Sequence, residues 1–320
     1  MPASPKAEKA PSALGPIIRI GDSRVRTGTC SWTDPTLRKE TDWYPKRTMS
    51  AADRLAYYAE RFPLVEADST YYRPPGEQLT RGWAQHTPSG FALNVKAYSL
   101  FTHHPTQPQS LWPDLHEGIK PEFVGKRRLY AEHLDPDALD EAWDRFAHAL
   151  TPLRRAGKLG AVLMQYPTWF TPKRANRQEL EKLATRLPNT RICVEFRSPR
   201  WLAADDREGT IDLLRGCDLA LVVVDAPLAS GLDTVAAVTC EDLAVVRFHG
   251  RADEAWKARD ATAAERFRYL YNDDELRGWA PKIRHLADEA TEVHVLMNNC
   301  YQDYGVRNAA DMQRLLRDLE

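Results

Sequence analysis

The stretch RICVEFRSPRW, from Arg191 to Trp201, indicates both the fold of this chain and the place of its site. Apolar and polar residues alternate in it, which is typical of a β-strand, and alternate residues of a strand share one face. Glu195 and Arg197 are therefore expected to point the same way. Pro199 ends the strand because proline lacks the N–H that sheet pairing requires. Charges at the end of an apolar strand are typical of active sites in α/β barrels, although a structural Glu–Arg pair that closes the barrel is the alternative.

Seven further segments are predicted as strands, and most of them are followed by a helical pattern. The eight predicted strands span 24–32, 64–70, 91–96, 159–167, 191–197, 219–227, 243–251 and 292–299. Several are nearly continuous apolar runs, which is typical of parallel strands that are buried on both faces. Eight strands that alternate with helices predict a (β/α)8 TIM barrel of the α/β class, and 320 residues fit one such domain.

The domain boundaries follow from composition. Residues 1–22 contain lysines but no apolar run, so they are predicted to be a flexible N-terminal tail rather than a signal peptide. Residues 23–320 are predicted to be the TIM-barrel domain, with a long proline-rich insertion at about 98–135 after the third strand. Loops of that length are usually functional lids or mobile segments. His103 and His104 lie in the insertion and would contact a ligand only if it folded over the pocket.

Composition limits the classes of function. Hydrophobic residues make up 43% and charged residues 28% of the chain, which is typical of a soluble enzyme. A net charge of -1 argues against a protein that coats nucleic acid by bulk electrostatics, but it allows a local basic patch. The five cysteines have no metal-binding spacing and cannot all pair, which predicts a reducing cytoplasm. No apolar run is long enough to cross a bilayer, so no membrane partner is expected.

Polar residues stand at or after the ends of the predicted strands, and such ends meet at one face of a barrel. We predict catalytic roles for Glu195, Asp225, His249 and Lys96. His249 would be a general acid or base oriented by Asp225 or Glu195. Lys96 would either form a Schiff base or pair with a carboxylate. We predict substrate contacts for Asp68, Tyr72, Gln165, Arg197, Arg247, Arg251, Asn298, Asn299, Arg307, Trp32 and Trp201.

The charges at these strand ends are nearly balanced, which disfavours a metal cage, and no cofactor is predicted. If a divalent metal ion is bound, Glu195, Asp225 and His249 are its expected ligands. Phosphate is the favoured guest, because the loops after the seventh and eighth strands carry glycines and arginines (Gly250, Arg251, Gly305 and Arg307). The alternative is that these are turn residues and solvated arginines. Loop aromatics would either stack on a sugar or base, or plug the barrel.

Several motifs, in chain order, resemble those of the YecE-like proteins, the family called domain of unknown function 72 (DUF72). They are GTCSW (28–32), YYAERFPLVEADSTYYRPP (57–75), NVKAYSLFTH (94–103), LMQYP (163–167), VEFRSPRW (194–201), VVVDAP (222–227), VRFHGR (246–251) and NNCYQDYGVRNA (298–309). The sequence departs from the family at GTCSW, where the family is closer to GTSGW, and in the insertion. The resemblance implies a TIM barrel similar to the endonuclease IV and xylose isomerase group, with no settled activity.

We therefore expect a cytoplasmic enzyme that binds a small anionic ligand at the C-terminal face of the barrel. The ligand would be a phosphorylated sugar or a nucleic-acid-derived molecule, and the reaction would use acid–base chemistry of the hydrolase or isomerase/lyase type. One alternative is an endonuclease IV-like, metal-dependent phosphodiester hydrolase. The other is a non-catalytic nucleic-acid-binding protein, whose affinity would fall steeply with salt.

Overall fold

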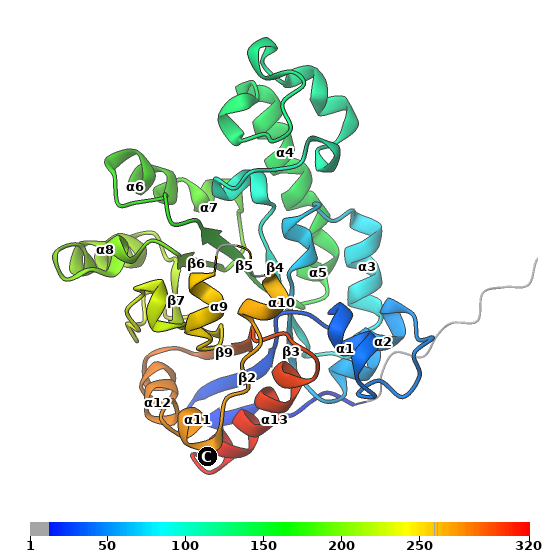
Figure 1. Ribbon diagram of the computed structural model, residues 1–320, viewed down its shortest axis with the longest axis vertical. Helices are drawn as coiled ribbons and strands as arrows, with labels where there is room; N and C mark the ends of the chain where they lie inside the picture. The colour runs from blue at the N-terminus through cyan, green and yellow to red at the C-terminus, as the bar shows by residue number, and fades with distance from the viewer. Residues whose placement is uncertain (1–12, 259, 261) are drawn as a thin grey trace, which may run out of the picture.

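The computed structural model describes residues 13–258, 260 and 262–320. In this part of the chain, eight parallel strands follow one another in sequence order, and the first also pairs with the last to close a barrel (Figure 1). They are β2 (Ser23–Thr29), β3 (Leu64–Ala67), β4 (Ala92–Lys96), β5 (Leu159–Tyr166), β6 (Ile192–Phe196), β7 (Ala220–Asp225), β8 (Ala244–Phe248) and β9 (Glu292–Met297). The predicted TIM barrel is therefore confirmed.

One further strand lies within the segment that the sequence assigns to the flexible tail. β1 (Ile18–Ile20) pairs antiparallel with β2, with Ile18 opposite Val25. Ile18 and Ile20 are each only 1% exposed. The tail prediction extends too far, because these two apolar side chains belong to the folded core. Residues 1–12 of the predicted tail lie outside the described residues.

Helices cover the outer face of the barrel (Figure 1). In α2, Ser50 and Asp53 form a capping box, in which each side chain accepts the backbone N–H of the other residue. Pro281 stands at the start of α12, so the chain breaks there between two helices, as the sequence predicts. None of the helices in the described part of the chain is long and apolar enough to cross a membrane. The helices are α1 (Pro35–Glu40), α2 (Ala51–Ala59), α3 (Glu77–Gln85), α4 (Pro136–Ala149), α5 (Thr151–Arg155), α6 (Arg174–Glu181), α7 (Leu183–Arg186), α8 (Ala204–Gly216), α9 (Asp253–Lys257), α10 (Ala263–Arg266), α11 (Asp273–Arg277), α12 (Ala280–Glu289) and α13 (Tyr304–Arg317).

Two buried apolar clusters hold the barrel. Inward-facing side chains such as Leu163 and Val222 fill the barrel, whereas outward-facing ones such as Val194 and Val246 pack beneath the helices. Each fully buried Val or Leu side chain stabilises the fold by about 1.5–3 kcal/mol. The charged side chains that face the barrel interior lie toward its two ends. We call the end formed by the carboxyl ends of the strands the mouth, and the opposite end the floor.

The GTCSW motif places β2 close against β3. A Cβ atom on Gly28 would lie 1.9 Å from the backbone oxygen of Leu64, so no larger residue fits at this position. The Tyr58 hydroxyl fixes the same contact, because it accepts the Thr29 N–H at 2.7 Å and donates to the Leu64 oxygen at 3.0 Å. This close packing sets the position of Cys30 at the mouth.

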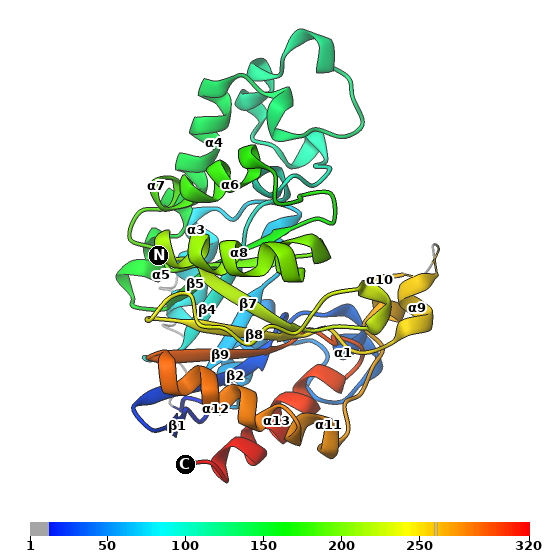
Figure 2. The same cartoon turned by 90° about the vertical axis from the view of Figure 1, so that its left-hand side faces the viewer.

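The insertion after β4 is built from short 3-10 helices rather than long regular elements. Four of them are η3 (Pro108–Ser110), η4 (Pro113–Gly118), η5 (Pro121–Phe123) and η6 (Ala131–His133), and two antiparallel bridges, Thr106–Leu129 and Ile119–Leu134, tie the segment together. In both views the insertion projects beyond the barrel together with α4 (Figures 1 and 2). Its first turn, η2 (Ser99–Thr102), follows β4 directly and leads to His103 and His104.

Candidate functional site

The inward-facing residues at the carboxyl ends of the strands form one polar group, which we call the mouth cluster. Four of its members are buried beneath the surface, and the other five are partly exposed above them. A ligand that entered the mouth would therefore meet the partly exposed members first. The buried members are Glu66, Glu195, Arg247 and His249, and the partly exposed members are Asp68, Lys96, Gln165, Arg197 and Asn298.

Arg247 bridges two buried carboxylates at the centre of the cluster. Its Nη2 donates to Glu66 Oε1 at 2.7 Å, and its Nη1 donates to Glu195 Oε2. The three side chains are at most 1% exposed. Removing an unpaired charge from water costs several kcal/mol, so the guanidinium is what allows both carboxylates to be buried here.

The second oxygen of Glu195 faces two further groups. Arg197 Nε lies 2.6 Å and His249 Nε2 lies 3.2 Å from Glu195 Oε1. Neither N–H is well aligned for a hydrogen bond, so these contacts are mainly electrostatic. Burial alone raises the pKa of Glu195, but Arg197, Arg247 and His249 outweigh it and hold that pKa well below its usual range. Glu195 is therefore a permanent carboxylate.

The carboxyl groups of Glu66 and Asp68 have raised pKa values, in contrast to Glu195. Burial raises the pKa of Glu66, and Arg247 and Lys96 offset this only in part. Burial also raises the pKa of Asp68 to about 6, despite the opposing charge of Lys96. Glu66 Oε2 has no hydrogen-bond partner among the described residues. The mouth therefore combines a fixed carboxylate with carboxyl groups that take up a proton more readily, which is typical of acid–base sites.

His249 is neutral in this environment. Burial and the charge of Arg197 lower its pKa to about 3. Its Nδ1 lies 2.8 Å from the Asn298 Nδ2 donor and 3.5 Å from Arg197 Nη2, so we assign the proton to Nε2, which faces Glu195. A general acid or base works best with a pKa near the working pH. The low pKa of His249 therefore disfavours the proton transfer that the sequence predicts for it, and the ring is a neutral neighbour of Glu195.

Lys96 differs from the other cations of the cluster. Its Nζ lies 4.6 Å from the centre of the Tyr71 ring. Among the described residues, no hydrogen bond from Nζ and no carboxylate within 4.0 Å of it is found. Burial and the charge of Arg247 lower the pKa of Lys96. The pairing of Lys96 with Asp68 that the sequence allows is thus an electrostatic interaction without a direct contact.

Aromatic rings surround the partly exposed members of the cluster. Tyr72 is 69% exposed and packs edge-on against Tyr71. The His104 ring lies 5.2 Å from that of Tyr71 and 6.1 Å from that of Trp169. Burial, together with Lys96 and Arg197, lowers the pKa of His104 to about 4. The insertion therefore brings His104 to the mouth, whereas His103 turns away and contacts Glu179 at 2.7 Å.

The three residues expected to hold a metal ion are not brought together. Glu195 and His249 face the barrel interior, but Asp225 continues the outward-facing side of β7. Among the described residues, no group of three or more His, Cys, Asp or Glu side chains could hold a metal ion. The predicted ligand set is therefore corrected, because alternate residues of a strand lie on opposite faces.

Asp225 braces the outside of the barrel. Its Oδ1 accepts from the Tyr271 hydroxyl at 2.8 Å and from Arg251 Nε at 2.9 Å. Its Oδ2 accepts from Trp279 Nε1 at 2.7 Å and from Arg251 Nη2 at 2.5 Å. With four donors, both carboxylate oxygens are used by the protein itself, and the Arg251 guanidinium is engaged as well. Neither residue is part of the mouth cluster.

The loops that the sequence predicts to bind phosphate are also occupied by internal contacts. The Gly250 N–H donates to the Tyr271 hydroxyl at 2.8 Å. Arg307 extends into solvent, with 54% of its side chain exposed, and lies 3.8 Å from Asp303. Asn299 is fully buried and donates to the backbone oxygen of Tyr269 and to Asn308 Oδ1, both at 2.8 Å. These side chains stabilise the β8 and β9 loops.

Two of the predicted substrate-binding aromatics are packing residues. Trp201 is fully buried, donates from Nε1 to the Phe170 oxygen at 2.6 Å and stacks on Phe196. Trp32 is 5% exposed and packs edge-on against Trp83. Both rings lie in the apolar layer outside the barrel, where a ligand at the mouth does not reach them.

The structure adds residues that the sequence did not assign to the site. Glu66 stands two positions before Asp68 on the same strand face, so the alternation that identified Asp68 also indicates Glu66. The ring of Trp256, on α9, lies 5.7 Å from Arg197 Cζ. The sequence around Trp256 has no strand pattern, so alternation does not indicate that this residue lies at the mouth. The positions of Trp256 and of Tyr71 depend on tertiary packing.

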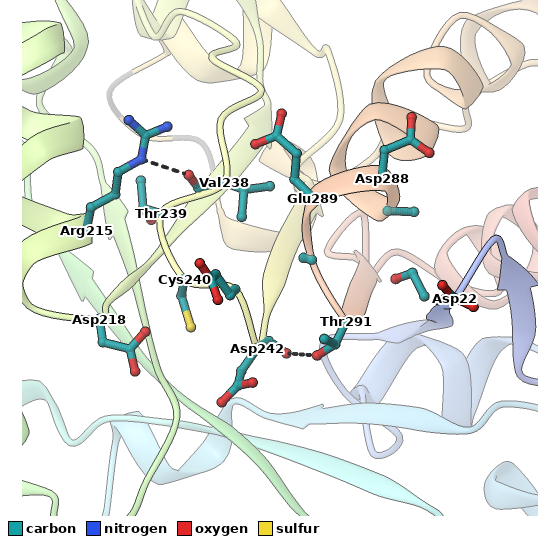
Figure 3. Close-up of a pocket in the computed structure, with 14 residues that line it drawn as sticks. Asp22, Arg215, Asp218, Val238, Thr239, Cys240, Asp242, Asp288, Glu289 and Thr291 are labelled. Carbon is teal, nitrogen blue, oxygen red and sulfur yellow. Dashed lines mark hydrogen bonds between the residues drawn. The ribbon is translucent and has the colours of Figure 1, made fainter.

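A separate hollow of about 800 Å³ lies at the floor, between the amino ends of the strands (Figure 3). Its lining includes the carboxylates of Asp22, Asp218, Asp242 and Glu289 and a single arginine, Arg215. This hollow is at the opposite end of the barrel from the mouth cluster. Catalytic residues in TIM barrels come from the carboxyl ends of the strands, so we place the functional site at the mouth.

Comparison with known proteins agrees with this architecture. Residues 26–320 match the family described as protein of unknown function DUF72. The chain belongs to that family. The UPF0759 protein YunF of Bacillus subtilis (strain 168) is 29% identical to it over 282 residues, which are 87% of this chain and 90% of that protein.

Crystal structures of two further DUF72 proteins are similar to this chain. The protein from Enterococcus faecalis V583 is 26% identical and superposes with a TM-score of 0.73, and the one from Thermotoga maritima MSB8 is 28% identical with a TM-score of 0.70. Both matches cover 91% of this chain, and they cover 95% and 98% of the other chains. None of these protein names states a function, so a function for this DUF72 chain has to be inferred from its mouth cluster.

Proposed function

We propose that this DUF72 protein is an enzyme that performs acid–base chemistry on a small anionic, sugar-like ligand at the mouth of the barrel. The observation that carries the proposal is the contrast between Glu195, whose pKa is held low, and Asp68, whose pKa is raised to about 6. One carboxylate stays charged and a neighbouring one exchanges protons near neutral pH. Such a division is how one site supplies a fixed charge and an acid or base.

The anionic character of the ligand follows from the cations that the protein leaves available. Arg197 contacts Glu195 through Nε, but its Nη1 carries no hydrogen bond among the described residues, and the Lys96 ammonium has no ion-pair partner there. A guanidinium with free donors suits a phosphate or carboxylate group. A nucleic acid needs a longer row of cations, so a small ligand is favoured.

The sugar-like character rests on the groups around these charges. Gln165 and Asn298 present amides at the mouth, where hydroxyl groups of a ligand would find donors and acceptors. Tyr71, Tyr72 and Trp169 provide ring faces, on which a sugar ring or a base packs. All five cysteines lie in the described part of the chain as free thiols, which supports the cytoplasm as the proposed location.

The test compares a charged sugar with its neutral parent. Binding of glucose 6-sulfate and of glucose is measured by calorimetry between pH 5 and pH 8, and the sulfate ester is chosen because a phosphate monoester itself titrates near pH 6. We expect the ester to bind and glucose to bind at least about tenfold more weakly, a difference of about 1.4 kcal/mol. The affinity for the ester should fall as pH rises through about 6, because Asp68 then acquires a negative charge.

Two variants and one competitor complete the test. In Asp68→Asn the pH dependence of binding should disappear, and in Arg197→Lys the affinity for the ester should fall, because the planar fork is lost. Lys282→Met is a control variant that removes a positive charge far from the mouth. Lys282 lies on the outer helix α12, with its Nζ 5.2 Å from the centre of the Trp279 ring, so binding should not change. Equal binding of ester and glucose would contradict the proposal. Tight, strongly salt-dependent binding of an oligonucleotide instead would establish the nucleic-acid-binding alternative.

A further inference from the structure

Two lysines in the described part of the chain, Lys96 and Lys158, are removed from water to a large extent, and they are held in different ways. Lys158 is 8% exposed, and its Nζ donates to the backbone oxygens of Ala84 at 2.6 Å and Thr87 at 2.5 Å. Lys96 has no such acceptors among the described residues, and its Nζ faces the Tyr71 ring at 4.6 Å. Lys158 therefore has a structural role, whereas the Lys96 amine faces an aromatic ring and has no hydrogen-bond acceptor in the described part of the chain.

The surroundings of Lys96 are those of a reactive amine. Two cations, Arg247 and Arg197, disfavour a third positive charge beside them. Glu66 and Glu195 act in the opposite direction, but burial and the two cations outweigh them, so the pKa of Lys96 is lowered. The carboxyl groups of Glu66 and Asp68 accept protons more readily than usual. A lysine that is removed from water and placed next to other cations is a nucleophile for carbonyl carbons.

We propose that Lys96 is a catalytic nucleophile that forms an imine with an aldehyde or ketone group of the ligand. This inference rests on the proposed function for the anionic ligand and its place at the mouth. It adds that the substrate carries a carbonyl group and that the reaction passes through a covalent intermediate on Lys96.

The step balances within the mouth cluster. The Lys96 ammonium gives one proton through a water molecule to the Asp68 carboxylate, and the free electron pair of Nζ forms a bond to the carbonyl carbon. A second proton passes from Nζ to the former carbonyl oxygen, which becomes a hydroxyl group. The protonated Asp68 then returns its proton to that hydroxyl, the C–O bond breaks, and water leaves. The products are a protonated imine and a carboxylate, so no electrons are exchanged with an external partner.

The imine is tested by trapping. The full-length protein is incubated with glycolaldehyde phosphate, a small anionic aldehyde, and reduced with sodium borohydride, which converts an imine into a stable secondary amine. Peptide mass spectrometry then locates the adduct. We expect it on Lys96, while Lys158 and Lys282 remain unmodified. In Lys96→Arg, which keeps the positive charge but cannot form the imine, the adduct should be lost.

The controls separate this inference from the proposed function. Thermal unfolding of Lys96→Arg confirms that the variant is folded, and calorimetry with glucose 6-sulfate measures ligand binding by the unmodified chain. If the ester binds but no adduct forms on Lys96, or if adducts spread over exposed lysines without preference, the imine is refuted while the proposed function stands. If the ester does not bind, the proposed function itself fails.

Discussion

The barrel interior carries a charged cluster at each end, and the two differ in what they leave unpaired. At the floor, Glu292 is surrounded by partners. Its Oε1 lies 2.7 Å from both Arg26 Nε and His294 Nε2, and its Oε2 lies 2.8 Å from Arg24 Nη2 and 3.6 Å from Arg191 Nη1. At the mouth, Glu195 is held in a similar way, but among the described residues Glu66 Oε2 has no hydrogen-bond partner and Lys96 Nζ has no ion-pair partner.

The unpartnered atoms at the two ends differ in kind. Near the floor they include the Asn94 amide, the Ser23 and Thr27 hydroxyls and His294 Nδ1, and burial lowers the pKa of this histidine so that its ring is neutral. At the mouth they belong to groups that can carry charge, Lys96 Nζ and Glu66 Oε2. Removing one member of a saturated buried ion cluster destabilises a fold, whereas ionisable groups with perturbed pKa values and no partner are typical of sites that act on a ligand. This difference is why we propose the mouth, rather than the floor, as the end of the barrel that binds a ligand.

The largest expected effect comes from breaking the floor cluster. Glu292→Gln removes the charge that Arg26 and Arg24 share, and it leaves a buried guanidinium without its carboxylate. The free energy of unfolding should fall by about 3–5 kcal/mol, measured by urea denaturation. The affinity of the folded variant for glucose 6-sulfate should remain that of the wild type. A variant that unfolds normally but binds the ester less tightly would assign a functional role to the floor.

A steric change at the floor should have a smaller effect. A Cβ atom on Gly160 would lie 2.3 Å from Asn94 Oδ1 and 3.2 Å from His294 Cε1, so Gly160→Ala forces buried side chains to move. We expect a loss of about 1–3 kcal/mol in the free energy of unfolding, again with ligand binding unchanged. Gly209→Ala is the matched control, because the Cβ meets nothing within 4 Å on α8 and alanine favours helix. Equal stability of the two variants would show that the Gly160 contact is unimportant.

At the mouth, removing a titrating group should stabilise the protein. Asp68 has a pKa of about 6 in the folded state and a usual value of 3.8, so the folded state binds more protons between these values. The stability contribution of Asp68 therefore falls as pH rises from about 4 to about 6 and stays low above that. Asp68→Asn should raise the free energy of unfolding by about 1–2 kcal/mol at pH 8 and by less at pH 4.5. This value allows for the partial exposure of the Asp68 side chain to solvent.

Thermal unfolding across this pH range measures the effect, and Asp303→Asn serves as a control. Asp303 lies at the exposed start of α13, near Arg307, where no comparable burial occurs. A destabilised Asp68→Asn at pH 8 would mean that the Asp68 carboxylate is part of a structural ion pair. Asp68 would then stabilise the fold, and the contrast between a structural floor and a mouth with unpaired ionisable groups would no longer hold.

The sequence predicted the barrel more completely than the site. Eight apolar runs fixed the strands, and alternation placed Lys96, Glu195 and Arg247 on the inner face, where the structure has them. The place of Asp225 at the end of β7 groups it with them in the sequence, although in the structure it accepts a hydrogen bond from Trp279 on the outside of the barrel. A strand end alone does not reveal which face its last residue takes.

Other parts of the site depend on packing that a sequence does not display. Trp201 and Tyr72 both follow strands and both are aromatic, yet the first is fully buried and the second is 69% exposed. Trp256 reaches Arg197 only because α9 lies over the mouth. The neutral state of His249 likewise arises from burial and from Arg197 rather than from its neighbours in the chain.

The proposed function depends most directly on the protonation state of Asp68. A carbon-13 NMR titration of the side-chain carboxyl groups, with Asp68→Asn used to assign the resonance, measures it without knowledge of the substrate. We predict a midpoint near pH 6 that moves upward when glucose 6-sulfate is added, because an anion beside Asp68 disfavours its charged form. A midpoint near the ordinary aspartate value of 3.8, unchanged by the ester, would contradict the account.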